Sequence, residues 1–111
     1  MSEARHLIVE SEAEEELAEG TAWYEEQQPG LGAAFLAEVD EVLSALERGE
    51  LISVPVPHVR TTLPVRRVLL VRFPYAIVFL GQDAQAHVLA VAHFKRRPGY
   101  WASRLRGLGE E

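Results

Sequence analysis

A chain of 111 residues is long enough for one domain, and its lack of cysteine excludes disulfide scaffolds, thiolate zinc sites and cysteine nucleophiles. Its first residues lack the cationic and apolar stretches of a secretory signal, and no apolar run approaches the ~20 residues needed to span a bilayer. We therefore expect a single domain over residues 1–111, located in the cytoplasm and not associated with a membrane.

The net charge of −6 is distributed unevenly along the chain. Residues 1–50 hold fourteen acidic and two basic side chains, whereas residues 51–111 hold three acidic and nine basic side chains. Because the two halves differ in sign, long-range attraction of the whole molecule to nucleic acid would be weak. Any contact with a polyanion is expected to be local and to involve the C-terminal half.

The first half of the sequence predicts a strand and two helices. A short strand over 6–10 precedes Ser11, and Ser11 with Glu14 has the spacing of a capping box at the start of a helix. A break at 28–32 ends this helix, and apolar residues at helical spacing predict a second helix that ends near Gly49. Two helices joined by a tight turn form an antiparallel hairpin.

The second half predicts a sheet. Residues 50–64 contain three prolines and are expected to cross the molecule without regular structure. Strands are predicted over 66–72, 75–80 and 87–94, and their short connections favour an antiparallel three-stranded meander. A short helical turn is expected over 100–105. The resulting fold class is α+β, in the order β-α-α-β-β-β, with the helical hairpin covering one face of the sheet.

The predicted strands carry more apolar side chains than two helices can cover. The residues concerned are Val68, Leu70, Ile77, Phe79, Leu89 and Val91. An uncovered apolar sheet face of this kind usually marks a partner surface. Alternatively, the C-terminal segment around Trp101 and Leu105 covers the second face of the sheet.

Residues 93–101 combine cations and aromatic rings directly behind an apolar strand. Cations beside stacking rings are typical of sites for a polyanion or an acidic partner. None of the four histidines has a second ligand at recognisable metal spacing, so neither a metal nor another cofactor is expected.

Four segments in this order, 23–27, 29–32, 72–79 and 92–101, resemble the RelE/ParE superfamily of bacterial toxins, which includes plasmid stabilisation proteins. The resemblance covers nearly the whole chain. It implies the RelE/ParE-like fold and a toxin of a type II toxin–antitoxin system, neutralised by a cognate antitoxin that covers its apolar and basic surfaces. RelE-like members cut mRNA in the ribosomal A site, whereas ParE-like members poison DNA gyrase.

The resemblance also implies where a nuclease site would lie. RelE-like toxins use lysines and arginines on the sheet and a tyrosine near the C-terminus to cleave RNA. In our alignment the strand arginine of those nucleases falls on Ala76, and their two lysines fall on Arg67 and Leu69. Arg96 matches the arginine at the end of the last strand, and Tyr100 lies near the C-terminal tyrosine. Since alanine and leucine cannot stabilise a phosphate, this set is incomplete.

Inhibition of gyrase requires a binding surface and no set of catalytic residues, so the residues favour a ParE-like function. We expect no small-molecule substrate. The expected target- or antitoxin-binding residues are Arg67, Arg72, Tyr75, Lys95, Arg96, Arg97, Tyr100 and Trp101. Two alternatives stay open. One is an mRNA endoribonuclease that uses His93 as its base, with Arg96, Arg97 and Tyr100 as its partners. The other is a member of the family without toxicity.

Overall fold

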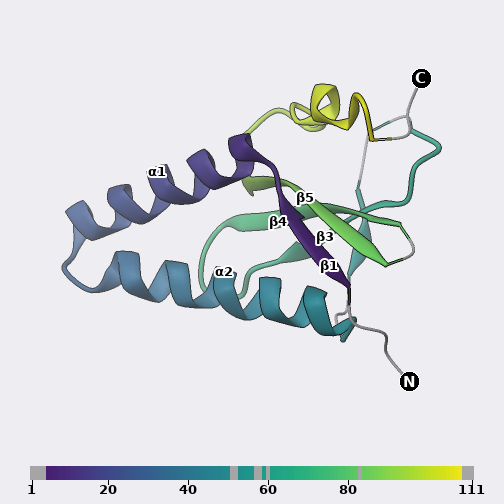
Figure 1. The fold of residues 1–111 in the computed structure, drawn as a ribbon. Helices are drawn as coiled ribbons and strands as arrows, with labels where there is room; N and C mark the ends of the chain where they lie inside the picture. The colour runs from purple at the N-terminus through teal and green to yellow at the C-terminus, as the bar shows by residue number, and fades with distance from the viewer. Residues whose placement is uncertain (1–4, 51–52, 57–58, 60, 83, 109–111) are drawn as a thin grey trace.

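Two antiparallel helices pack against one face of a five-stranded sheet in the computed structural model, which describes residues 5–50, 53–56, 59, 61–82 and 84–108 (Figure 1). The elements are β1 (His6–Val9), α1 (Ser11–Gln27), α2 (Leu31–Arg48), β2 (Val54–Pro55), β3 (Val65–Leu69), β4 (Tyr75–Gln82), β5 (Gln85–His93) and the 3-10 helix η1 (Ala102–Leu105). The predicted α+β class, with a helical hairpin before a three-stranded meander, is confirmed. No helix in the described part of the chain is long and apolar enough to cross a membrane.

The sheet has the strand order β1-β5-β4-β3-β2. The meander β3-β4-β5 is antiparallel, whereas β1 lies parallel to β5. The two-residue strand β2 was not expected, because Pro55 disfavours a central strand. It pairs with β3 at the edge of the sheet, where a missing N–H is tolerated. The predicted strand 66–72 ends at Leu69, because the N–H groups of Val71 and Arg72 donate to the Glu38 carboxylate of α2.

The turn between the helices is held by the side chain of Glu25. Its carboxylate accepts the N–H groups of Gly30 and Gly32 at 3.0–3.1 Å, which satisfies free donors at the start of α2. Gly30 has a φ of 91°, and a Cβ on Gly32 would lie 2.5 Å from the Thr21 carbonyl oxygen. These contacts explain why glycines occupy both positions.

The predicted capping box at the start of α1 is wrong, although the helix does begin at Ser11. The N-cap residue is Glu10, with no side-chain cap, and the Ser11 hydroxyl donates to Glu12 instead. The reason is that the N–H of Glu10 still donates to the Val88 carbonyl of β5. Pairing with β5 therefore places Glu10 at the junction between strand and helix.

The first core lies between the helical hairpin and the sheet and is centred on aromatic rings. Phe73 packs edge-on against Tyr24 and Phe35, with ring centroids 4.8 and 5.2 Å apart. Gly20 permits this approach of the helices, because a Cβ there would lie 2.9 Å from the Phe35 ring. Tyr24 thus packs within the hairpin, whereas Trp23, which lies edge-on to Tyr24, is 55% exposed.

The expectation that two helices leave the strand side chains uncovered is wrong. Of the six side chains considered, five belong to the core beneath the hairpin, namely Val68, Leu70, Ile77, Phe79 and Val91. Alternation along the strands points these residues to the same side, and the hairpin is long enough to cover them.

The C-terminal segment covers part of the second face, as the alternative proposed. Trp101 and Leu105 are 4% and 1% exposed, and they pack on the opposite face of the sheet from the helices. The sheet residues beneath them are Val65, Val78, Leu80, Leu89, Ala90 and Ala92. Figure 1 shows η1, in yellow, on the far side of the sheet from α2.

A β-bulge in β5 places Leu89 on this second face. Val78 pairs with Ala90 and Phe79 pairs with Val88, so Leu89 is the extra residue. Leu89 and Ala90 therefore both contribute to the second core, whereas Val88 and Val91 contribute to the first. Alternation without a bulge would place Leu89 and Val91 on the same face.

Phe35→Ala should lower the free energy of unfolding by about 3–5 kcal/mol, because it removes a fully buried ring at the centre of the first core. Leu43→Ala, at a half-buried position beside the same core, should cost only about 1–2 kcal/mol. Urea unfolding followed by circular dichroism measures both values. Equal losses for the two variants would contradict the assigned core.

Candidate partner-binding site

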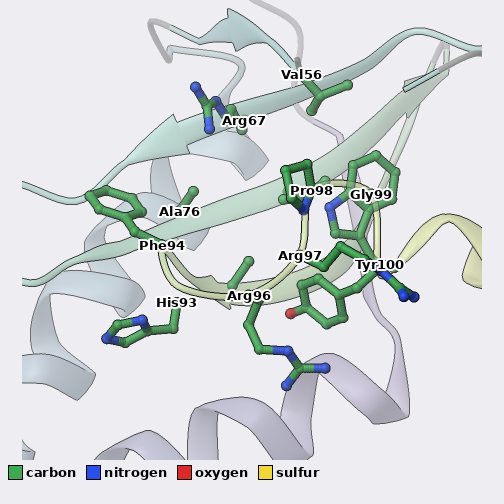
Figure 2. Close-up of a pocket in the computed structure, with 13 residues that line it drawn as sticks. Val56, Arg67, Ala76, His93, Phe94, Arg96, Arg97, Pro98, Gly99 and Tyr100 are labelled. Atoms are coloured by element: carbon green, nitrogen blue, oxygen red, sulfur yellow. The ribbon is translucent and has the colours of Figure 1, made fainter. Parts of the chain in front are cut away.

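A groove lies on the second face of the sheet, beside the part that the C-terminal segment covers (Figure 2). It is a hollow of about 500 Å³ including its open mouth. Ala76 and Ala92, which pair across β4 and β5, form its floor. The other lining residues are Val56, Arg67, Val78, His93, Phe94, Arg96, Arg97, Pro98, Gly99, Tyr100 and Trp101. The groove is therefore built from small and apolar side chains with cations at its edges.

Arg67 is the cation most closely built into the groove. It is half-buried on β3, and its Nε atom is buried without a hydrogen-bond partner among the described residues. A buried donor of this kind retains an unmet capacity to bind an acceptor.

The three arginines that line the groove do not converge on one point. The Arg96 guanidinium stacks on the Tyr100 ring, 3.9 Å from its centroid, on the side nearer α1. Figure 2 shows Arg67 on the opposite side of the groove, near Val56, and Arg97 directed away from both. The three guanidinium groups therefore point in different directions in this arrangement.

Glu16 of α1 fastens the C-terminal segment beside the groove. Its carboxylate accepts the Val91 N–H at 3.0 Å, the Tyr100 hydroxyl at 2.5 Å and both terminal nitrogens of Arg104 at 3.0 and 3.2 Å. Arg104 also donates to the carbonyl of Leu89, the bulge residue, at 2.9 Å. We call these residues the Glu16 network.

The Glu16 network keeps Tyr100 protonated. Burial, the hydrogen bond to Glu16 and the charge of Glu16 raise the pKa of Tyr100 well above its ordinary value of 10.0, against the opposing effect of Arg104 and Arg96. Burial acts to lower the pKa of Arg104, but the hydrogen bond and charge of Glu16 outweigh it and raise that pKa. The Tyr100 hydroxyl is therefore a donor committed to Glu16.

His93 lies at the exit of β5 between two neighbours. Its Nδ1 accepts the Lys95 N–H at 3.0 Å, and its ring packs edge-on against Tyr75 at 5.0 Å. In the described residues there is no group of three or more His, Asp or Glu side chains placed to hold a metal ion.

Comparison with known proteins identifies a structural relative for this architecture. No family model and no curated protein matches the sequence. A chain of the chromosomal ParDE toxin–antitoxin system from P. aeruginosa superimposes with a TM-score of 0.68, at 17% identity, over 81% of this chain and 96% of that chain. The fold is ParE-like.

Within this ParE-like fold the predicted site residues fall into separate groups. Arg67, Arg96, Arg97, Tyr100 and Trp101 line the groove, although Trp101 is also buried in the second core. The exposed Lys95 follows His93 at the end of β5.

Two of the predicted residues lie away from the groove. Tyr75 packs against Phe35 on the helix side of the sheet. Arg72 lies over the Phe73 ring, in the turn that Glu38 holds. Tyr75 nevertheless lines a second hollow that it shares with Arg96 and Tyr100, so it adjoins the groove residues, whereas Arg72 lines neither hollow.

Glu16 and Arg104 were missed because each looked ordinary in the sequence. Glu16 stands in a run of acidic residues typical of a solvated helix face. Its spacing of four residues from Gly20, on the apolar side of α1, was the available signal. Arg104 carried no comparable signal.

Tyr100→Phe should reduce the loss of stability at high pH. Because the pKa of Tyr100 is raised in the folded protein, the wild-type free energy of unfolding should decrease as the pH rises above about 10, where the unfolded chain ionises. At neutral pH the free energy of unfolding of the variant should be about 1–2 kcal/mol lower than that of the wild type, because the hydrogen bond is missing. As the pH rises, it should then decrease less steeply than that of the wild type.

Urea unfolding at about pH 8 and at about pH 10.5 measures both effects. Some decline should persist in the variant, because burial also raises the pKa of Tyr24 and of Tyr75. Equal pH dependence in the two proteins would contradict the assigned environment of Tyr100.

Proposed function

We propose that this chain is the toxin of a type II toxin–antitoxin pair, that it acts in the cytoplasm by binding DNA gyrase, and that a cognate antitoxin neutralises it. The ParE-like fold shared with a ParDE chain supports a toxin of this class. We also propose that residues 1–111 work as one domain.

The observation that carries the choice of target is the composition of the groove. At the position where the resemblance to RelE-like nucleases calls for an arginine, Ala76 is 3% exposed and forms the floor. Cleavage of RNA requires a base, cations at the phosphate and a proton donor for the leaving oxygen, all directed at one point. The groove supports binding better than cleavage, because its cations diverge.

The remaining candidates for acid and base chemistry are engaged elsewhere. The Tyr100 hydroxyl donates to Glu16, and Nδ1 of His93 accepts a backbone N–H. A surface that blocks an enzyme by binding to it requires neither group to be free. These contacts therefore favour gyrase inhibition over ribosome-dependent mRNA cleavage.

Induced expression should arrest growth, and co-expression of the adjacent open reading frame should restore it. Purified protein should inhibit supercoiling by DNA gyrase, while ribosome-bound mRNA stays intact in a parallel cleavage assay.

Arg97→Ala should weaken gyrase inhibition and change stability by less than about 0.5 kcal/mol, because the side chain is exposed. Arg96→Ala, which also removes the stack on Tyr100, should have an equal or larger effect on inhibition.

Arg48→Ala is the matched control, since Arg48 is an exposed arginine at the far end of α2. Cleavage of ribosome-bound mRNA with supercoiling unaffected would overturn the gyrase target in favour of a RelE-like nuclease. Absence of any growth defect would contradict the toxin assignment itself.

A further inference from the structure

The second hollow lies on the helix side of the sheet, between α1 and the strand ends where β4 begins and β5 finishes. It measures about 570 Å³ including its open mouth. The buried residues Gly20 and Val91 form its floor. We call it the Trp23 hollow, after an exposed ring that the proposed function does not yet use.

Aromatic rings form much of the wall of the Trp23 hollow. Trp23 comes from α1, Tyr75 from β4 and His93 from β5, and the last two pack edge-on with their centroids 5.0 Å apart. Trp23 is 55% exposed, whereas large aromatic side chains usually bury most of their surface in the core. Its indole therefore offers ring surface to a ligand in the hollow.

Glu19 supplies a carboxylate beside this ring. It lies one turn before Trp23 on α1, so both side chains share one face of the helix. Glu16 also lines the hollow, but it is held by Tyr100 and Arg104. Glu19 forms no salt bridge within the described part of the chain.

The negative charge of α1 extends into the hollow. Between residues 11 and 27 the sequence has seven glutamates and no Lys, Arg or His. Burial is the largest cause that raises the pKa of Tyr75, and Tyr24, Glu16 and Glu19 raise it further. A phosphate group would therefore be repelled from this side of the molecule, whereas a cation would be attracted.

Arg96 is the one arginine or lysine among the residues that line the hollow, and it does not neutralise Glu19. Its guanidinium stacks on the Tyr100 ring, 3.9 Å from the centroid. The salt bridges of the described residues do not include one between Arg96 and Glu19. The Glu19 carboxylate is thus available to a cation from another molecule.

A ring beside a carboxylate is the combination that binds a guanidinium group. Arginine stacks its planar head on an aromatic ring and donates two N–H groups to a carboxylate. The protein already contains one such site, because Arg104 donates both terminal nitrogens to Glu16 and lies 5.1 Å from the Tyr100 ring. Glu19 and Trp23 repeat the carboxylate and the ring about one turn further along α1.

We propose that the Trp23 hollow binds an arginine side chain of the target protein, with its guanidinium stacked on the Trp23 ring and paired with the Glu19 carboxylate. An enzyme that acts on DNA presents arginines and lysines where it holds the phosphates, so the proposed target has side chains of this kind. The inference rests on the proposed function, because the partner is the target. It adds a contact on the helix side of the sheet, separate from the groove.

The first test uses the full chain and a probe peptide, without the target. In the NMR spectrum of the labelled protein, the indole N–H resonance that disappears in Trp23→Phe belongs to Trp23. Titration with the peptide acetyl-Gly-Arg-Gly-amide should shift this resonance. The same peptide with citrulline, which has a similar shape without the charge, should not shift it.

Glu19→Gln should weaken binding of the arginine peptide by roughly fivefold or more. Glu14→Gln is the matched control: Glu14 is an exposed glutamate of the same helix that does not line the hollow, so the affinity should stay within roughly twofold of wild type. No shift at millimolar peptide, equal shifts with both peptides, or equal losses in both variants would overturn the site. A short RNA that displaces the peptide would overturn it in favour of a polyanion site.

The second test measures inhibition of gyrase supercoiling. Glu19→Gln and Trp23→Ala should raise the concentration needed for half-inhibition by roughly tenfold, whereas Glu14→Gln should change it by less than roughly twofold. All three side chains are exposed, so thermal unfolding should show the variants to be folded like the wild type.

The outcomes separate the two proposals. A wild type that binds the arginine peptide through Glu19 but does not inhibit gyrase overturns the proposed function and the assignment to the target, while the arginine site stands. Inhibition that is unchanged in Glu19→Gln and Trp23→Ala overturns the target contact alone. Variants that inhibit gyrase normally but no longer bind the product of the adjacent open reading frame also overturn it, in favour of the antitoxin.

Discussion

The carboxylate of Glu16 is the contact on which the arrangement of this protein depends. It lies on α1, accepts an N–H from β5, and holds Tyr100 and Arg104 of the C-terminal segment. The side chains of Glu16 and Arg104 are only 12% and 14% exposed, so the loss of either leaves a charge poorly solvated. One acidic side chain thus joins the helix layer, the sheet and the segment on its opposite face.

The β-bulge at Leu89 makes this junction possible. It turns the Leu89 carbonyl toward Arg104 and the Val91 N–H toward Glu16, at a point where β1 has ended and β5 has a free edge. The C-terminal segment is thereby fixed over one half of the second sheet face. The other half forms the groove that contains Arg67, and the proposed binding activity depends on that half staying open.

The sequence predicted the fold well because its signals are local. Helical spacing, the glycines at 30 and 32 and the alternating strands located both helices and the meander. The bulge was not predictable, since it depends on pairing between β4 and β5, and it places Leu89 on the opposite face from Val91. The composition of the site was partly predictable: Arg67, Arg96 and Tyr100 were identified, but the position of Tyr100 depends on Glu16, which only its spacing of four residues from Gly20 set apart from its acidic neighbours.

Amide hydrogen exchange of the Glu16→Gln variant tests the central role of this carboxylate most directly. The amide of Val91 and those of η1 should lose protection by roughly tenfold or more, while the amides of α2 stay protected as in the wild type. That pattern would show that Glu16 holds the C-terminal segment on the sheet. Unchanged protection of Val91 and η1, or an equal loss throughout the protein, would contradict the account.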